Sequence, residues 1–381
     1  MNESEKRATT KKTTRTDPAY GALRKRPSTM DFFRKHRAGI LIVLTFFCVV
    51  LLSVGGWLLI DWLKAPDHPT ATTASDHSSA TTVSDSRGPD ITPAPLPLDG
   101  KIIFLDAGHG GYDNGCNYPE DDPVYKEKEF NLQIAIEAKK QLEALGAEVI
   151  MTRTDDSFIS IYARPALVHL FCLDYLKENG LLSISADTEM RLREGMNQAI
   201  QINSTDISAG CMGAMVGSGF SDDLIELLEL EYQLDHIIFI SVHNNWGSNT
   251  KRHGTAVYYV TDESIIESED RLIKKDPYYA NPDYTVREHY YGRDGERNRT
   301  LARFLHDSIV ASAPELNNDL PDLVTDNFAV LREQGLASVM LELTYLSNPE
   351  DRELWTDPDV VRKMAEGISN GCLYYYNNTD A

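Results

Sequence analysis

Residues 129–153 read EFNLQIAIEAKKQLEALGAEVIMTR, and this stretch decides the fold class. Its first part has the apolar spacing of a helix, which Gly146 closes as a C-cap. The strand candidate AEVIMTR, residues 147–153, follows directly, and the β-branched run KIIFLD, residues 101–106, stands before the helix. The order strand, helix, strand indicates the start of an α/β domain.

The same alternation continues toward the C-terminus. DHIIFISVH (235–243), GTAVYYV (254–260) and ASVMLEL (337–343) read as further strands, and residues 300–312 and 358–376 read as helices. Fully apolar strands separated by helices are typical of a sheet that is covered on both faces. The sequence therefore predicts an α/β domain with a mostly parallel sheet.

The charge of the chain is unevenly distributed. The whole chain has 37 Lys and Arg against 58 Asp and Glu, but residues 1–37 have 11 against 4, a net charge of +7. Residues 38–60 contain no charged side chain and are long enough to span a bilayer. Basic residues concentrated before this run predict a transmembrane signal anchor with a cytoplasmic N-terminus. A cleaved signal peptide is the less favoured alternative, because the basic region and the apolar run are both long.

The regions after the anchor differ in composition. Residues 61–99 are rich in Ser, Thr and Pro, which predicts a disordered linker. Residues 100–381 would form the globular domain, on the extracytoplasmic side of the cell membrane. The chain beyond residue 37 has a net charge of −28, and such a polyanion is repelled by phosphate backbones. We therefore expect no nucleic acid among its partners.

Three polar residues stand at comparable places in the strand pattern. His109 follows the first strand candidate, His243 ends another, and Glu342 lies in the last. Ligands of open α/β sheets gather beyond the carboxyl ends of the strands, so these side chains could converge. Each also has a structural interpretation as a hydrogen-bonded strand-end residue, and no HExxH motif is present.

Several motifs in this order resemble the zinc-dependent N-acetylmuramoyl-L-alanine amidases of type 3. They are LDAGHGGYDNG, EKEFNLQIA, GAEVIMTRTDD, FISVHNN and VMLELTYLSNPED, within residues 101–168 and 236–376. The resemblance implies a mixed sheet of about six strands flanked by helices. It also implies a peptidoglycan hydrolase that cleaves the amide bond between N-acetylmuramic acid and L-alanine.

The resemblance also implies roles for single residues. His109, Glu127 and His243 match the zinc ligands of the family, and Glu342 matches the catalytic glutamate that acts on the zinc-bound water. Glu129 is the rival of Glu127, since both lie near the start of the same helix. The expected cofactor is Zn²⁺, and the expected substrate is peptidoglycan.

Other positions match the family less specifically or depart from it. Arg153, Arg164 and Asn245 are candidates either for contact with the substrate or for structural support of the site. Thr344 and Tyr345 stand where the family usually has Gly-Phe, so the turn after the catalytic glutamate is expected to differ.

Two segments are longer than in the family pattern, residues 169–235 and about 261–297. The first has 12 Asp and Glu against 3 Lys and Arg, and it ends in the amphipathic run SDDLIELLELEYQLD. One interpretation is a solvated acidic helical decoration. The other, which resembles a feature of some family members, is a helix that covers the zinc until a protein activator removes it.

Two other functions remain open on the sequence alone. The chain could be an inactive membrane-tethered scaffold that binds peptidoglycan, or a zinc peptidase that cleaves another bond of the stem peptide. The presence of all four site residues argues against the scaffold.

Overall fold

A computed structural model describes residues 94–205, 221–275, 295–318 and 321–379 of the 381-residue chain. The predicted cytoplasmic arm, the predicted membrane helix at 38–60 and most of the predicted linker lie outside these residues. Among the helices within these ranges, none is both long enough and apolar enough to cross a membrane.

Strands and helices alternate along the described chain. The strands are β1 (Ile102–Ala107), β2 (Asn117–Tyr118), β3 (Tyr125–Lys126), β4 (Glu148–Met151), β5 (Ile237–Asn245), β6 (Ala256–Tyr259), β7 (Leu323–Thr325) and β8 (Ala337–Tyr345). The helices are α3 (Glu127–Ala144), α4 (Ala163–Glu178), α5 (Ala186–Ile202), α6 (Asp222–Tyr232), α7 (Asp262–Lys275), α8 (Gly295–Ser312), α9 (Ala329–Arg332), α10 (Pro349–Leu354) and α11 (Pro358–Thr379), with a 3₁₀ turn at Pro314–Leu316.

The central sheet has six strands in the order β4-β1-β5-β8-β6-β7. The pairs formed by β4, β1, β5 and β8 are parallel, whereas β6 runs antiparallel to β8 and parallel to β7. This mixed, mostly parallel sheet confirms the predicted fold class. Strands β2 and β3 form a separate antiparallel hairpin.

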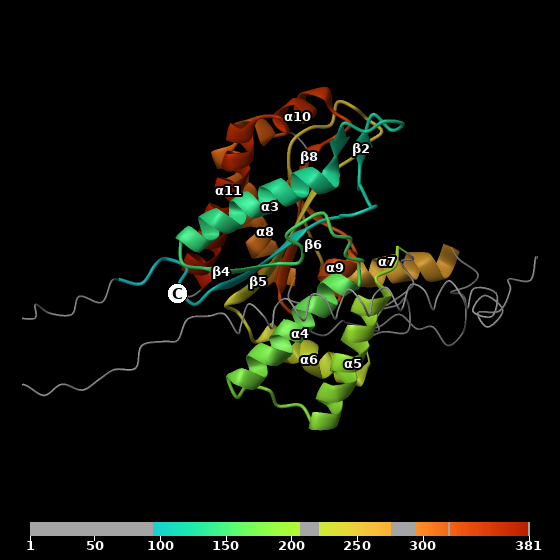
Figure 1. Ribbon diagram of the computed structural model, residues 1–381, viewed down its shortest axis with the longest axis vertical. Helices are drawn as coiled ribbons and strands as arrows, with labels where there is room; N and C mark the ends of the chain where they lie inside the picture. The colour runs from blue at the N-terminus through green and yellow to red at the C-terminus, as the bar shows by residue number, and fades with distance from the viewer. Residues whose placement is uncertain (1–93, 206–220, 276–294, 319–320, 380–381) are drawn as a thin grey trace, which may run out of the picture. The chain divides into compact units, whose positions relative to one another are not determined.

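Alternate residues of the central strands face opposite sides, as the pleat requires. Ile103 and Leu105 of β1 belong to the core that α3, α8 and α11 cover, and Ile102 and Phe104 belong to the core that α4, α5 and α6 cover. In Figure 1, α4, α5 and α6 lie below the strands, and α3 and α11 lie on the other side of them. Both faces of the sheet are therefore buried, which explains the fully apolar strands.

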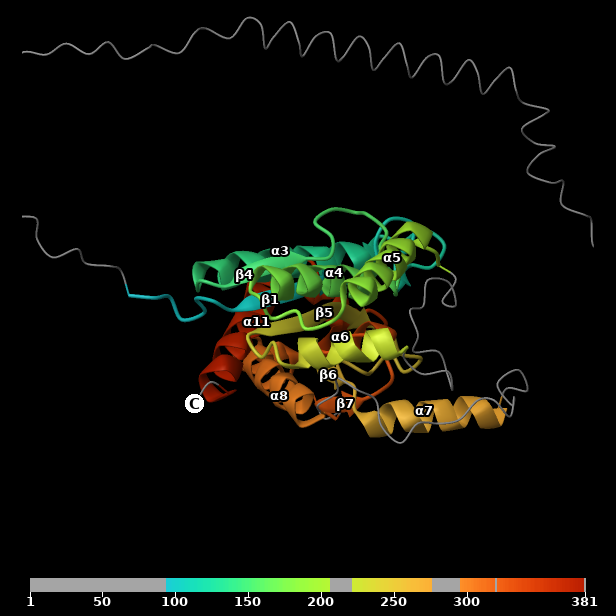
Figure 2. The same cartoon turned by 90° about the horizontal axis from the view of Figure 1, so that it is seen from below.

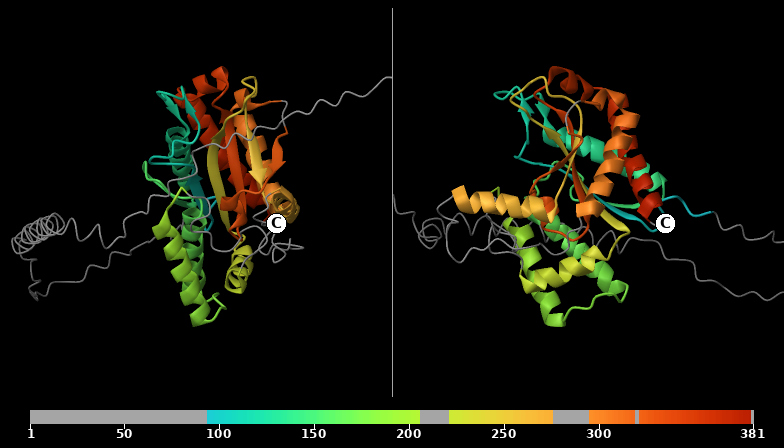
Figure 3. Two further views of the ribbon diagram at one scale, coloured as in Figure 1. Left: turned by 90° about the vertical axis from the view of Figure 1, so that its right-hand side faces the viewer. Right: turned by 180° about the vertical axis from the view of Figure 1, so that it is seen from behind.

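The helices of the long segment 169–235 form part of the lower layer (Figure 3). The amphipathic run SDDLIELLELEYQLD contains α6, whose N-cap is Ser221. This helix buries Leu224, Leu227 and Leu228. In α5, Leu192 and Met196 are buried against the same core. These helices are thus integral to the domain rather than a solvated decoration. Residues 206–220 of the segment lie outside the described part.

Helix α7 projects away from the sheet beyond the end of β6 (Figure 2). It occupies the first part of the second long segment, about 261–297, for which the sequence predicted no defined element. The three-residue strand β7 was not predicted either, because a run of that length has no measurable periodicity. Its place in the sheet follows from pairing with β6.

Candidate metal centre

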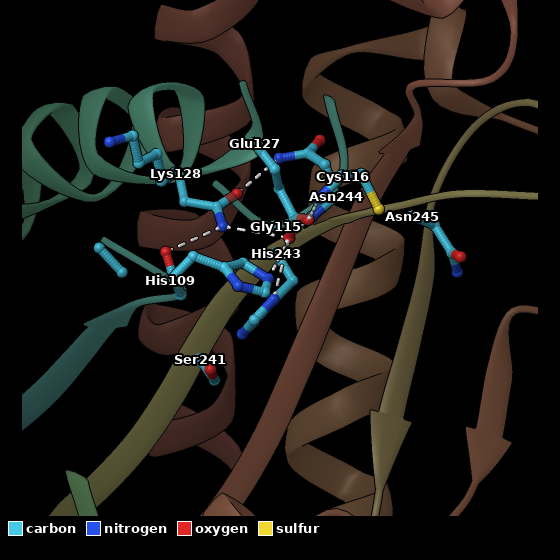
Figure 4. Close-up of polar contacts among 12 residues, drawn as sticks. His109, Gly115, Cys116, Glu127, Lys128, Ser241, His243, Asn244 and Asn245 are labelled. Carbon is cyan, nitrogen blue, oxygen red and sulfur yellow. Dashed lines mark hydrogen bonds and ion pairs between the residues drawn. The ribbon is translucent and has the colours of Figure 1, made fainter. Parts of the chain in front are cut away.

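The three predicted zinc ligands come together at the carboxyl-terminal edge of the sheet. His109 lies in the loop after β1, Glu127 is the first residue of α3, and His243 lies near the end of β5. One ligand atom from each lies within 4.8 Å of the other two, and Figure 4 shows the side chains turned toward one another. The rival candidate Glu129 is exposed and pairs with Lys126 instead.

The carboxylate of Glu127 lies between both histidines. Its Oε1 is 3.2 Å from His109 Nε2 and 3.0 Å from His243 Nδ1, and it accepts the backbone N–H of Asn244 at 3.1 Å. Its Oε2 accepts the backbone N–H of Cys116 at 2.8 Å. Burial raises the pKa of Glu127, but the hydrogen bonds and charges of the two histidines bring it well below its ordinary value. The group is therefore ionised, as a metal ligand has to be.

Asp113 orients His109, a role that the sequence did not reveal. The distance from His109 Nδ1 to Asp113 Oδ2 is 2.8 Å, so the ring donates its Nδ1–H to this carboxylate and Nε2 faces Glu127. Metal-binding histidines commonly donate their second ring N–H in this way. Burial lowers the pKa of His109, but hydrogen bonds to Asp113 and Glu127 raise it to about 10. A bound cation would replace the proton that the ring holds.

Glu342 lies beside His243 on the neighbouring strand. The two residues are register partners in the parallel pair of β5 and β8. The Oε2 atom of Glu342 is buried and has no hydrogen-bond partner among the described residues. Burial, and then the negative charge of Glu127, raise the pKa of Glu342 well above its ordinary value. A carboxyl group with an oxygen that has no hydrogen-bond partner can accept and hold a proton.

A sequence profile described as N-acetylmuramoyl-L-alanine amidase matches residues 103–374 of the chain. The chain belongs to this amidase family. The N-acetylmuramoyl-L-alanine amidase AmiC of Neisseria meningitidis serogroup B is 25% identical over 292 residues, which are 73% of this chain and 53% of AmiC. The probable cell wall amidase LytH of Staphylococcus epidermidis is 23% identical over 282 residues, 74% of this chain and 60% of LytH. The chain thus spans only about half to three fifths of these relatives.

Solved amidase structures are also similar to this chain. The crystal structure of the N-acetylmuramoyl-L-alanine amidase from Clostridium difficile 630 has a TM-score of 0.43 and 19% identity, and covers 74% of this chain and 98% of its own. The CwlD amidase from Clostridioides difficile, solved in complex with the GerS lipoprotein, has a TM-score of 0.43 and 21% identity, with coverages of 73% and 99%.

Two buried arginines of the amidase domain hold the loop that carries His109. Arg153 Nε donates to the carbonyl of Ala107 at 2.8 Å. Arg164 forms a buried ion pair with Asp106, and its Nη2 donates to the carbonyl of His109 at 2.9 Å. Both guanidinium groups form these contacts inside the domain. The two arginines therefore support the loop that carries His109.

Asn245, the third candidate, points away from the three candidate ligands (Figure 4), and its Oδ1 accepts the backbone N–H of the next residue. Its neighbour Asn244 supports the centre instead. Besides its contact with Glu127, Asn244 accepts a hydrogen bond at 2.7 Å from the hydroxyl of Thr344, which in turn accepts the indole N–H of Trp355 at 2.6 Å. Thr344, where the sequence departs from the family pattern, thus stabilises the strand ends beside the site.

Two glycines of the amidase site leave room for the ligands. A Cβ atom on Gly108 would overlap the ring of His243, and one on Gly115 would overlap the carboxylate of Glu127. Gly115 also has a φ of +64°, which favours glycine. Any side chain at either position would displace a ligand.

The predicted acidic lid over the zinc has no counterpart in the described part of the segment 169–235. None of the described Asp and Glu side chains of this segment forms a hydrogen bond or ion pair with the three ligands or Glu342. Its stretch 206–220 lies outside the described residues, and a protein activator that acts on the segment stays a prediction.

Proposed function

We propose that this chain is a zinc-dependent peptidoglycan hydrolase that cleaves the amide bond between N-acetylmuramic acid and L-alanine of the stem peptide. Membership of the N-acetylmuramoyl-L-alanine amidase family supports this reaction. The structural observation that supports it most is the convergence of His109, Glu127 and His243 beside the open oxygen of Glu342.

The donor set fits zinc. Two imidazole nitrogens and one carboxylate oxygen are ligands that catalytic zinc uses, and three protein ligands leave a fourth position open. When bound, zinc polarises the amide carbonyl and lowers the pKa of water. The Asp113 carboxylate would keep Nε2 of His109 aimed at the ion, because it holds the opposite ring nitrogen.

Glu342 would transfer the proton. Its Oε2 takes a proton from the attacking water, whose oxygen forms a bond to the lactyl carbonyl carbon. The same atom then delivers the proton to the nitrogen of L-alanine as the C–N bond breaks, which leaves a carboxylic acid, which then ionises, and the amine of L-alanine. No described side chain competes for Oε2.

The variant Glu342→Gln tests this role in the full-length chain. Hydrolysis of purified peptidoglycan should fall about 10²- to 10⁴-fold, the usual contribution of a general acid–base group, while zinc content stays unchanged. The matched control is Glu129→Gln, because Glu129 is exposed and should leave hydrolysis unchanged. Hydrolysis by Glu342→Gln at the wild-type rate would contradict the role. If the wild-type chain binds no zinc and hydrolyses no peptidoglycan, the result would instead support the alternative of an inactive scaffold that binds peptidoglycan.

We propose the following arrangement for the whole chain. Residues 1–37 lie in the cytoplasm, residues 38–60 cross the cell membrane once, and a linker that begins at residue 61 leads to the amidase domain, which faces the cell wall. The support is the uncharged run and the basic residues before it. The anchor would keep the enzyme next to its polymeric substrate. The predicted linker 61–99 ends slightly too late, because Leu98 is buried in the core of the domain and its N–H donates to the carbonyl of Leu145.

A further inference from the structure

We propose that Asn203, at the end of α5, is a positioning residue for the loop that carries His109. This inference rests on the proposed zinc site. It means that the long segment 169–235 helps to hold one of the proposed zinc ligands in place. Asn203 caps α5 in the left-handed conformation, with φ 36° and ψ 52°. Its Oδ1 accepts the backbone N–H of Ser160 at 2.8 Å, and its Nδ2 donates to the carbonyl of Phe158 at 2.9 Å. One side chain therefore joins the long segment to residues 158–160.

The helix that presents Asn203 is fixed in the domain. Leu192, Met196 and Ala199 of α5 are buried and pack in the core below the sheet. The Ser185 side chain caps the other end of the helix by accepting the backbone N–H of Thr188 at 3.0 Å. Asn203 thus extends from a rigid support, and its two hydrogen bonds can hold a neighbouring loop in place.

Residues 157 and 158 in turn support the loop after β1. The ring of Phe158 stacks on the ring of Tyr112, with centroids 4.4 Å apart and planes at 25°. A Cβ atom on Gly111 would lie 2.8 Å from the Cβ of Phe158, and one on Gly110 would overlap the carbonyl oxygen of Ser157. The backbone at 110–111 therefore rests directly on the segment that Asn203 holds.

This loop needs external support because of its backbone. His109 has a φ of +62°, an uncommon conformation for a residue with a side chain, and Gly110 and Gly111 follow with φ values of +132° and +60°. Such conformations persist where the surroundings hold them. Arg164 still binds the carbonyl of His109, and Asp156 accepts the N–H of Gly111, so loss of Asn203 should loosen the loop rather than unfold it.

The variant Asn203→Gly tests the inference, because glycine keeps the left-handed backbone and removes both side-chain hydrogen bonds. The matched control is Asn179→Gly, which removes another helix C-cap whose side chain bonds the carbonyl of Tyr175 in its own helix. In the metal-free full-length chain, amide hydrogen exchange should become faster in peptides spanning 107–113 for Asn203→Gly alone. The zinc affinity of this variant, measured against a competing chelator, should fall about three- to ten-fold.

Wild-type exchange at 107–113 in a folded Asn203→Gly variant would overturn the inference. The variant Asn203→Asp gives an independent test, because it keeps an acceptor for Ser160 and loses the donor to Phe158. Its exchange at 107–113 should lie between those of wild type and Asn203→Gly, and should exceed wild type even if the glycine variant does not fold. The exchange experiment needs neither zinc nor substrate. Its result can therefore be interpreted even if the chain does not hydrolyse peptidoglycan.

Discussion

Asp113 fixes the ring of His109, and its loss should weaken the metal centre. Without this carboxylate the ring loses its 2.8 Å hydrogen bond and can rotate away from Glu127. We expect Asp113→Ala to lower zinc affinity about 10- to 100-fold, the usual effect of removing such a partner. Glu129→Ala is the control, since Glu129 points to solvent near the same site. Chelator competition measures both variants, and an unchanged affinity for Asp113→Ala would rule out the orienting role.

The ligand candidates could be found in the sequence because each stands in a short motif at a strand end or a helix start. The residues that support the ligands could not be found in this way. Asn244 and Thr344 are separated by 100 positions, and neither residue type is unusual at the end of a strand. The pairing of β5 with β8 brings them together, so their contact depends on the folded sheet.

At the scale of elements, a buried ion pair joins the two ends of the long segment 169–235, and a hydrogen bond from Gly335 ties that pair to the rest of the domain. His169 Nδ1 of α4 lies 2.6 Å from Glu231 Oε1 of α6, and Glu231 Oε2 accepts the backbone N–H of Gly335 before β8 at 2.8 Å. Burial lowers the pKa of His169, but the charge and hydrogen bond of Glu231, together with Glu333, raise it overall. The nearby Cys172 stays neutral, because burial raises the pKa of its thiol well above the ordinary value.

This pair should make stability depend on pH. Because the pKa of His169 is raised in the folded state, the contribution is complete below about pH 6.5, the unfolded value, and is lost as the pH rises through the folded value. We expect His169→Gln to lower the free energy of unfolding by about 3–5 kcal/mol at pH 6 and by less at pH 9. Denaturant titrations at both pH values measure the difference. A loss that is the same at both would mean that the charge of His169 is irrelevant.

Long apolar runs predicted the main strands and α3, α8 and α11 within a few residues. The helices α4, α5 and α6 were harder to place, because the acidic residues of 169–235 suggested a solvated segment. The apolar residues of α5 and α6 show otherwise, since Leu192, Met196 and Leu224 are buried in the core below the sheet. An acidic average can therefore hide helices whose one apolar face is part of the core.

At the scale of the whole molecule, the basic arm and the acidic domain should lie on opposite sides of the cell membrane. Protease added to intact cells without their wall should digest an epitope at the C-terminus and spare one at the N-terminus. Lysed cells provide the control, in which both epitopes are digested. Digestion of the N-terminal epitope in intact cells would contradict the orientation. Release of a shortened chain without that epitope would support a cleaved signal peptide.

Mass spectrometry of peptidoglycan digested by the full-length chain tests the central claim most directly. The proposed amidase should release stem peptides with a free amine on L-alanine, and leave N-acetylmuramic acid residues that carry no peptide. Addition of a zinc chelator should abolish both products. Fragments cut within the stem peptide, with L-alanine still attached to the sugar, would contradict the assignment and support a peptidase.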